Sequence, residues 1–208
     1  MNSTKIAIID YGMGNLRSVL NALLQVGAVG EVVSRPEDVA EYSKIILPGV
    51  GAFNEAIVNL NRFGMAEALT GVKNNGVPVL GICLGMQLMC KISEEDGLHQ
   101  GLGWIDAAVR RFPDRPGMKV PHIGWNDLTV CYPHYLVEGL PMHPDVYFVH
   151  SYRVECADPA DALATCDYGE EFTAIFAREN VTGIQFHPEK SQAIGLRMLK
   201  NFAEHVPC

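Results

Sequence analysis

The sequence has little positive charge and no block of it. Its 208 residues include 16 lysines and arginines against 24 aspartates and glutamates, which gives a formal net charge of −8. Binding to nucleic acid phosphates requires clustered Lys and Arg side chains. We therefore expect no nucleic acid partner.

Long apolar runs are also missing. No stretch reaches the roughly 18 apolar residues of a membrane span, and the apolar run near the N-terminus is too short for a signal peptide. These two absences predict a cytoplasmic protein with no membrane partner. Apolar residues still make up 48% of the chain and charged residues 19%. This composition fits a single α/β domain over residues 1–208.

The cysteines lack paired metal-ligand spacing. None of the six forms a CxxC pair, so the sequence predicts no zinc site and no other metal or cofactor. A disulfide framework is not expected in a chain of this length without an export signal. Most of these thiols are expected to be small buried residues. Only the sequence around Cys83 indicates a chemical role.

Strand-like and helix-like segments alternate through the first half of the chain. Short apolar runs bounded by turn residues predict strands, and a 3.6-residue periodicity predicts helices. The expected strands are residues 5–10, 30–34, 44–51 and 77–82, and the expected helices are residues 15–27, 36–40, 52–75 with a break near Gly64, and 84–93. This alternation favours a mainly parallel sheet covered on both faces.

The second half is richer in strand-like segments that follow one another closely. They are residues 146–154, 164–169, 172–179 and 181–186, before a final amphipathic helix over residues 192–206, while residues 96–120 carry no readable pattern. Hairpin-like spacing predicts an antiparallel extension of the sheet. The fold class is therefore α/β, with a mainly parallel central sheet flanked by helices and an antiparallel extension in the C-terminal half.

One cysteine stands between two glycines in GICLG, residues 81–85. Glycines allow a sharp strand-to-helix turn that exposes the central side chain, here Cys83. The helix that follows supplies a positive dipole end and free backbone N–H groups, which stabilise a thiolate and can face an oxyanion. Taken alone, the motif favours a tight turn that buries a small cysteine.

A base for this thiol is found in GIQFHPEKS, directly after an apolar strand. Pro188 disfavours helical geometry for His187, and in an extended segment His187 and Glu189 share a face. Glu189 can then orient the imidazole while the other ring nitrogen faces the thiol, as in a catalytic triad. The loop LPGVGAF follows another strand and can supply a backbone N–H to a reacting carbonyl. Together these loops predict thiolate attack on an amide or ester.

Five motifs of the chain match a known family. PGVGAF, GICLGMQ, HIGWN, YFVHSY and GIQFHPEKS resemble the class I (triad-type) glutamine amidotransferases. Within this class, the sequence is most similar to the family of glutaminase subunits of imidazole glycerol phosphate synthases. The resemblance covers nearly the whole chain, from IDYGMGN to the helix after FHPEKS, and it implies a flavodoxin-like fold.

The resemblance implies a role for each matching residue. Cys83 would attack the side-chain carboxamide of L-glutamine, His187 would transfer protons, and Glu189 would orient His187. The implied oxyanion hole consists of the Leu84 N–H and an N–H from Val50–Gly51. The implied substrate-binding groups are Gln87 and the backbone of Ser151 and Tyr152, and the implied partner-facing residues are Trp125, Tyr147 and Lys190.

The resemblance also implies a partner. In that family a separate (β/α)₈-barrel cyclase subunit uses the ammonia in histidine biosynthesis, forming a heterodimer with the glutaminase. The β-branched Val50 resists unusual backbone dihedrals, so the loop can rest with its N–H turned away from the oxyanion. We therefore expect the free subunit to be nearly inactive until the partner and its ligand reorient Val50–Gly51.

Three other functions remain open at this level. The chain could serve a different ammonia-using synthase, such as one that makes pyridoxal phosphate or anthranilate. It could be a non-catalytic redox or ligand-binding protein with a reactive cysteine on the same fold. It could also be a free-standing γ-glutamyl hydrolase that needs no partner.

Overall fold

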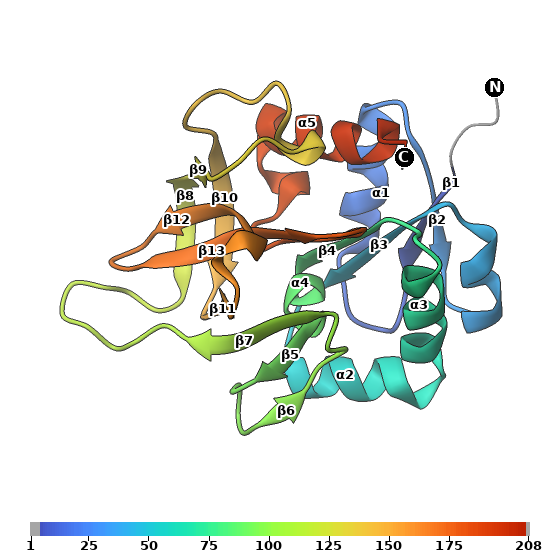
Figure 1. Ribbon diagram of the computed structural model, residues 1–208, viewed down its shortest axis with the longest axis horizontal. Coiled ribbons are helices and arrows are strands. Elements are labelled where there is room, and N and C mark those ends of the chain that lie inside the picture. The colour runs from blue at the N-terminus through green and yellow to red at the C-terminus, as the bar shows by residue number, and fades with distance from the viewer. Residues whose placement is uncertain (1–4, 207–208) are drawn as a thin grey trace.

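The computed structural model describes residues 5–206, and its helices and strands alternate through the first half of the chain (Figure 1). The helices are α1 (Leu16–Gln25), α2 (Phe53–Arg62), α3 (Met65–Asn74), α4 (Leu84–Leu88) and α5 (Gln192–Glu204), with 3-10 turns at Pro36–Glu41, Tyr135–Val137, Pro159–Asp161 and Pro188–Lys190. The strands are β1 (Lys5–Ile9), β2 (Val29–Val33), β3 (Lys44–Gly49), β4 (Val79–Cys83), β5 (Cys90–Ser93), β6 (His99–Gln100), β7 (Ile105–Arg111), β8 (His122–Asp127), β9 (Thr129–Val130), β10 (Asp145–His150), β11 (Tyr152–Cys156), β12 (Ala162–Asp167), β13 (Glu171–Arg178) and β14 (Val181–Ile184).

The large sheet has a parallel half and a mostly antiparallel half. Its order is β2-β1-β3-β4-β14-β13-β11-β7-β5-β6, and β12 and β9 continue from β13. Strands β2, β1, β3, β4 and β14 pair in parallel. From β14 onward the pairings of β13, β11 and β7 are antiparallel. The predicted fold class is therefore confirmed.

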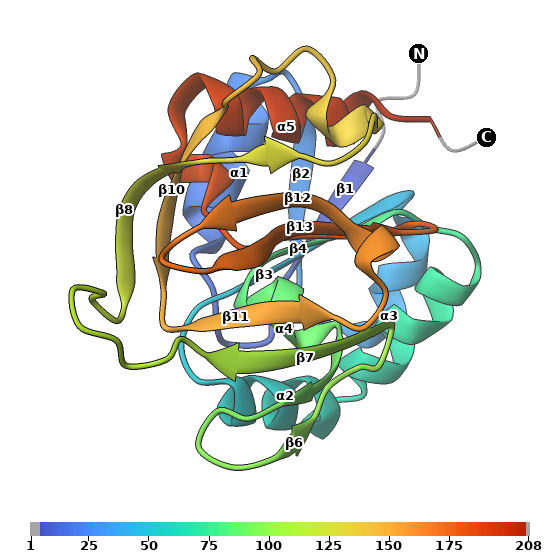
Figure 2. The same ribbon diagram turned by 60° about the vertical axis from the view of Figure 1, so that its left-hand side comes forward.

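Two apolar cores lie on opposite faces of the parallel strands. Along β1, Ile6 and Ile8 pack with α1 and α5, whereas Ala7 and Ile9 pack with α2 and α3. Figure 2 shows α1 with α5 on one side of the sheet and α2 with α3 on the other. Strands buried on both faces are the continuous apolar runs that the sequence shows, because period-2 alternation sends apolar side chains into both layers.

Local sequence explains where several helices begin and end. The side chain of Asn15 accepts a hydrogen bond from the Ser18 N–H and caps α1. Gly64 has a φ of 76° and separates α2 from α3, as its position in the sequence predicts. Among residues 5–206, the structure contains no helix long and apolar enough to cross a membrane.

Two predicted elements differ in the structure, and one segment without a prediction contains strands. The expected strand 146–154 is two strands, β10 and β11, which are separated at Ser151 and join different sheets, because β10 pairs with β8 and β11 with β7 and β13. The helix that begins at Leu84 ends at Leu88, and the chain turns into β5 beside β7. The unreadable segment 96–120 contains β6 and β7.

Candidate active site

The candidate site lies where three neighbouring parallel strands end. Cys83 is the last residue of β4, and Gly49 at the end of β3 is its register partner. His187 follows β14, which pairs with the other edge of β4 through Ile184 and Ile82. The carboxyl ends of parallel strands meet at one edge of a sheet, where ligands bind in open α/β folds. The order β3-β4-β14 thus brings together the three loops that the sequence singled out.

Cys83 occupies a strained backbone conformation. Its φ is 55° and its ψ is −111°, although it has a β-carbon. A non-glycine residue with positive φ is uncommon, and such strain persists only where the surroundings fix it. The side chain is 7% exposed and lines a cleft. This is the geometry of a nucleophile elbow, in which the turn holds the central side chain at the top of the sheet.

The glycines on either side of Cys83 allow the helix to approach the sheet. A β-carbon at Gly81 would lie 2.7 Å from the Met86 nitrogen. One at Gly85 would overlap the carbonyl oxygen of Leu47 on β3. Only residues without a β-carbon fit at these two positions, because backbone atoms of the neighbouring element fill the space. The elbow therefore depends on both glycines.

The base and its orienting carboxylate come from the turn after β14. His187 Nδ1 lies 2.8 Å from Glu189 Oε1, and both side chains are almost fully buried. His187 is extended, with φ −98° and ψ 99°, as the following proline predicts. The extended segment does not continue to Glu189, because Pro188–Lys190 form a 3-10 turn, and this turn makes the contact instead. The Ser191 hydroxyl donates to the His187 carbonyl at 2.7 Å and accepts from the Tyr147 N–H at 3.0 Å.

The charge state of His187 depends on its two neighbours. Burial by itself lowers the pKa of the imidazole, but hydrogen bonds and Coulomb attraction from Cys83 and Glu189 outweigh it and raise the pKa to about 9. Nδ1 donates to Glu189, so Nε2 is the nitrogen that serves Cys83. At neutral pH the imidazolium form is favoured beside the sulfur, which is the arrangement that stabilises a thiolate.

The PGVG loop (residues 48–51) is fixed at its base by a buried tyrosine. The Tyr11 hydroxyl donates to the Pro48 carbonyl oxygen at 2.9 Å. A β-carbon at Gly49 would overlap this hydroxyl, so the glycine is needed for the contact. Further along, Val50 is 42% exposed and Gly51 has a φ of 105°, which glycine adopts readily.

A cleft of about 420 Å³ opens above Cys83. It is lined by the predicted site residues Val50, Gly51, Cys83, Leu84, Gln87, Ser151, Tyr152, His187 and Lys190, together with Glu95, Pro121, Val149 and His150. Glu189 stands behind His187, outside this lining. The predicted nucleophile, base, oxyanion and substrate groups thus share one hollow, and their individual roles stay predictions.

Gln87 is held tightly beside this cleft. Its Nε2 donates to the Tyr152 carbonyl oxygen at 3.2 Å and to Gln185 Oε1 at 2.9 Å. An amide nitrogen carries two hydrogens, and both are used here. The oxygen of Gln87 is therefore the atom left for a ligand, and it can only accept a hydrogen bond.

The three predicted partner-facing residues also lie together. Trp125 on β8 is the register partner of Tyr147 on β10, and their rings meet edge to face with centroids 5.9 Å apart. The Lys190 ammonium lies 5.9 Å from the centroid of the Tyr147 ring. Trp125 is 44% exposed. The cluster borders the cleft through Lys190, which lines it.

Four residues of the site were missed in the sequence. Tyr11 comes just after β1, and His150 ends β10. A position at a strand end is the feature of the sequence that could have identified both residues. Gln185 is a fully buried polar residue next to the apolar strand β14. Glu95 accepts from the Phe53 N–H at 2.9 Å, and burial raises its pKa. No local pattern marks Glu95.

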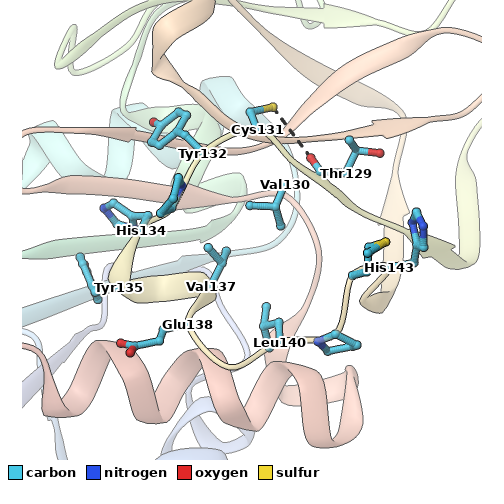
Figure 3. Close-up of a pocket in the computed structure, with 13 residues that line it drawn as sticks. Thr129, Val130, Cys131, Tyr132, His134, Tyr135, Val137, Glu138, Leu140 and His143 are labelled. Atoms are coloured by element: carbon cyan, nitrogen blue, oxygen red, sulfur yellow. Dashed lines mark hydrogen bonds between the residues drawn. The ribbon is translucent and has the colours of Figure 1, made fainter.

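A larger hollow lies elsewhere on the molecule. It measures about 910 Å³ and is lined by residues within 129–143, with Val130, Tyr135, Val137 and Leu140 among them (Figure 3). None of its lining residues belongs to the cleft above Cys83. Size alone therefore does not identify the reactive site. Cys131 and His134 line the larger hollow, but Cys131 Sγ contacts the Thr129 carbonyl and His134 Nδ1 accepts from the Leu136 N–H. The smaller cleft is the one that joins a cysteine of strained backbone to a histidine held by a carboxylate.

Comparison with known proteins agrees with this geometry. The sequence model of the family Glutamine amidotransferase class-I matches residues 7–206. Solved structures share the fold: PurLQS from Thermotoga maritima has a TM-score of 0.75 at 18% identity, with 95% of each chain covered. The crystal structure of a glutamine amidotransferase has a TM-score of 0.73 at 21% identity and covers 95% of this chain and 98% of its own. Fold and site thus define a class-I glutamine amidotransferase.

Closer relatives narrow the assignment. The imidazole glycerol phosphate synthase subunit HisH 2 of Pseudomonas aeruginosa is 46% identical over 97% of this chain and 100% of its own length. The subunit HisH of Geobacter sulfurreducens is 49% identical over 97% of this chain and 99% of its own. The chain belongs to the HisH family of imidazole glycerol phosphate synthase subunits, within the class-I glutamine amidotransferases.

Proposed function

We propose that this chain, acting as one catalytic domain, hydrolyses L-glutamine to glutamate and ammonia and passes the ammonia to a cyclase subunit. The observation that carries the proposal is the strained elbow of Cys83 in one cleft with His187, which Glu189 contacts from behind. The HisH relatives support histidine biosynthesis as the pathway. The partner would be a (β/α)₈-barrel cyclase subunit that makes imidazole glycerol phosphate and aminoimidazole carboxamide ribotide.

The first half-reaction forms a thioester. The Cys83 thiolate attacks the carboxamide carbon of glutamine, and the carbonyl oxygen becomes an oxyanion. When the C–N bond breaks, His187 gives its proton to the departing nitrogen, so that ammonia leaves and a γ-glutamyl thioester remains. Glu189 stabilises the imidazolium before this step and keeps Nε2 directed at the reacting atoms.

The second half-reaction restores the enzyme. The now neutral His187 takes a proton from a water molecule, whose oxygen attacks the thioester carbon. The C–S bond breaks, glutamate leaves, and the Cys83 thiolate and His187 imidazolium are regenerated. The backbone N–H groups of Leu84 and of Val50 or Gly51 would hold the oxyanion in both halves, since donors placed where charge develops lower the barrier.

The opposite wall of the cleft would orient the substrate. Ser151 and Tyr152 contribute backbone at the junction of β10 and β11, and Gln87 offers its amide oxygen as an acceptor. The α-ammonium of glutamine is the substrate group that such an acceptor suits. These contacts support binding of an amino acid through its main-chain end while the carboxamide reaches Cys83.

Ammonia must reach the partner without meeting water, because ammonium at neutral pH is a poor nucleophile. A docking face next to the cleft meets this need. The cluster of Trp125, Tyr147 and Lys190 supports such a face, since aromatic residues are enriched at interfaces and Lys190 belongs to both cluster and cleft. Partner binding there would reach the PGVG loop across the cleft and turn Val50–Gly51 toward the oxyanion.

The proposal is tested by measuring glutamate release from glutamine. The assay uses this chain alone, then with the cyclase subunit from the same organism and its ribotide ligand, with Cys83→Ala as the control. We expect release mainly in the complete mixture and none from the control. Free hydrolysis without the partner would contradict the partner assignment, and no release by the folded wild-type complex would contradict the glutaminase activity.

A further inference from the structure

A buried chain of hydrogen bonds runs from the nucleophile to the strand that carries Trp125. At one end, Gln185 Nε2 donates to Cys83 Sγ at 3.8 Å, within reach of a hydrogen bond to sulfur. The Gln185 oxygen accepts from Gln87, which also donates to the Tyr152 carbonyl. A single amide, Gln185, thereby joins the sulfur to a residue of the substrate wall.

The chain of hydrogen bonds continues through two histidines. His150 Nδ1 lies 2.8 Å from the Tyr152 carbonyl oxygen, and His150 Nε2 lies 3.0 Å from His122 Nδ1. A carbonyl can only accept, so His150 must carry its hydrogen on Nδ1. Its Nε2 is then an acceptor, and His122 must donate from Nδ1. One tautomer of each neutral ring satisfies both contacts, so the direction of every link is fixed.

The rings have no freedom to change this arrangement. His122 stacks on Tyr168 with centroids 3.9 Å apart and on Phe148 at 4.7 Å. His122 is 2% exposed, His150 7% and Gln185 0%. Burial lowers the pKa of His122 to about 4 and that of His150 to about 3, so both rings are neutral near pH 7.

The chain of hydrogen bonds also crosses the point where the two sheets meet. His122 and His150 are register partners in the small sheet of β8 and β10, which also contains the Trp125–Tyr147 pair. Tyr152, on the other side of Ser151, belongs to the large sheet. The link between His150 and the Tyr152 carbonyl is therefore the one that spans the two sheets.

We propose that this chain of hydrogen bonds holds the Cys83 thiol in position and couples it to the small sheet. It runs His122–His150–Tyr152 carbonyl–Gln87–Gln185–Cys83, and Gln185, His150 and His122 are positioning residues. Its bearing on glutamine hydrolysis rests on the function proposed above. Gln185 donates an N–H hydrogen bond to the sulfur. The two histidines hold the Tyr152 carbonyl in place, and this carbonyl in turn holds Gln87.

The test follows the alkylation of Cys83 by iodoacetamide in the full-length chain, resolved from the other cysteines by peptide mass spectrometry, between pH 5 and pH 9. Gln185→Leu removes the donor to sulfur, and we expect alkylation at pH 7 to slow about tenfold, the order of magnitude for losing one hydrogen bond to the reacting sulfur. His122→Phe keeps a ring but loses the donor, and we expect a severalfold slowing. His122→Asn retains a donor at the position of Nδ1 and should restore most of the rate.

Thr182→Val is the matched control, because it removes one buried hydrogen bond from the same region of the sheet and none from the hydrogen-bond chain. Its alkylation profile should equal that of the wild type. Profiles for Gln185→Leu and His122→Phe that match the control would overturn the proposal. If Gln185→Leu does not fold, the comparison of His122→Phe with His122→Asn decides it.

Alkylation needs neither glutamine nor a partner, so it separates this proposal from the proposed function. Glutamate release by the wild-type complex, with unchanged alkylation in every variant, rejects the hydrogen-bond chain and keeps the glutaminase. Altered alkylation in the two variants, with no glutamate release by the wild-type complex, keeps the positioning role and rejects the glutaminase. In an active complex, His122→Phe should lower partner-stimulated kcat more than it changes KM.

Discussion

Gly49 lies opposite Cys83 in the parallel register of β3 and β4. The PGVG loop therefore leaves the sheet directly beside the nucleophile, although the two residues are far apart in the sequence. A β-carbon at Gly49 would meet Leu84 Cβ at 2.9 Å and overlap the Tyr11 hydroxyl. One pairing thus fixes where the elbow, the loop and the tyrosine meet.

The charge of Glu189 controls the base. Glu189→Gln keeps the size of the side chain but removes its negative charge, so burial and the remaining partner leave the His187 pKa well below about 9. We expect partner-stimulated kcat to fall by roughly 10²–10⁴-fold, the range for general acid–base catalysis. Histidine NMR titration checks the pKa, and glutamate release checks the rate. An unchanged rate would show that Glu189 does not orient the base.

Gly85 is required for the elbow to pack. Gly85→Ala would drive a methyl group into the Leu47 carbonyl, and we expect the free energy of unfolding to drop by about 1–3 kcal/mol. Gly71→Ala in α3 is the control, since no atom lies within 4 Å of its added β-carbon. That variant should gain up to about 1 kcal/mol through helix propensity. Urea unfolding measures both, and equal stability of the two variants would contradict the packing argument.

Tyr11 anchors the PGVG loop. Tyr11→Phe leaves the Pro48 carbonyl without its donor, and we expect the free energy of unfolding to fall by about 1–3 kcal/mol, the cost of a buried unsatisfied acceptor. Partner-stimulated glutamate release should fall as well, because the loop loses its fixed base. The measurements are denaturant unfolding and the activity assay. Wild-type stability would mean that water replaces the hydroxyl at no cost.

The two neutral histidines make the fold sensitive to acid. Their folded pKa values, about 4 for His122 and about 3 for His150, lie below the value of about 6.5 for an unfolded histidine. The unfolded chain therefore binds more protons as the pH falls below about 6.5, and stability is lost from there down through the folded pKa values. His187 is a further charged group that acts on His150.

Removing one of these histidines should flatten that dependence. We expect His122→Asn to reduce the slope of unfolding free energy against pH by up to about 1.4 kcal/mol per pH unit between pH 6 and pH 4.5, because one titrating group is gone. Urea unfolding at several pH values measures the slope. The same slope in both proteins would show that His122 titrates normally in the folded chain.

Trp125 is the test of the partner face. Trp125→Ala should weaken binding of the cyclase subunit by roughly 30-fold or more, as expected for an aromatic residue that contributes about 2 kcal/mol or more to an interface. Phe63→Ala is the control: Phe63 is 64% exposed and follows α2, away from the small sheet. Calorimetric titration with the cyclase subunit measures both affinities, and equal affinities would place the interface elsewhere.

Local sequence patterns specify the individual elements of this protein. Apolar runs and helical periodicity located the parallel strands, α1 and α5, because burial on one or both faces leaves a repeating pattern in adjacent residues. Gly64 marked the break between α2 and α3. The glycines around Cys83 and the HPE motif marked the elbow and its base, since a sharp turn and a proline restrict the backbone wherever they occur.

The contacts between distant residues follow from the assembled fold. The contacts of Gln87 with Tyr152 and Gln185, and of Gln185 with Cys83, join residues 65 to 102 positions apart. No periodicity encodes such contacts, because they depend on strand order and register. The same holds at Ser151, where one apolar run is divided between two sheets. A run of apolar residues specifies that it is buried, whereas its partners are set by the rest of the fold.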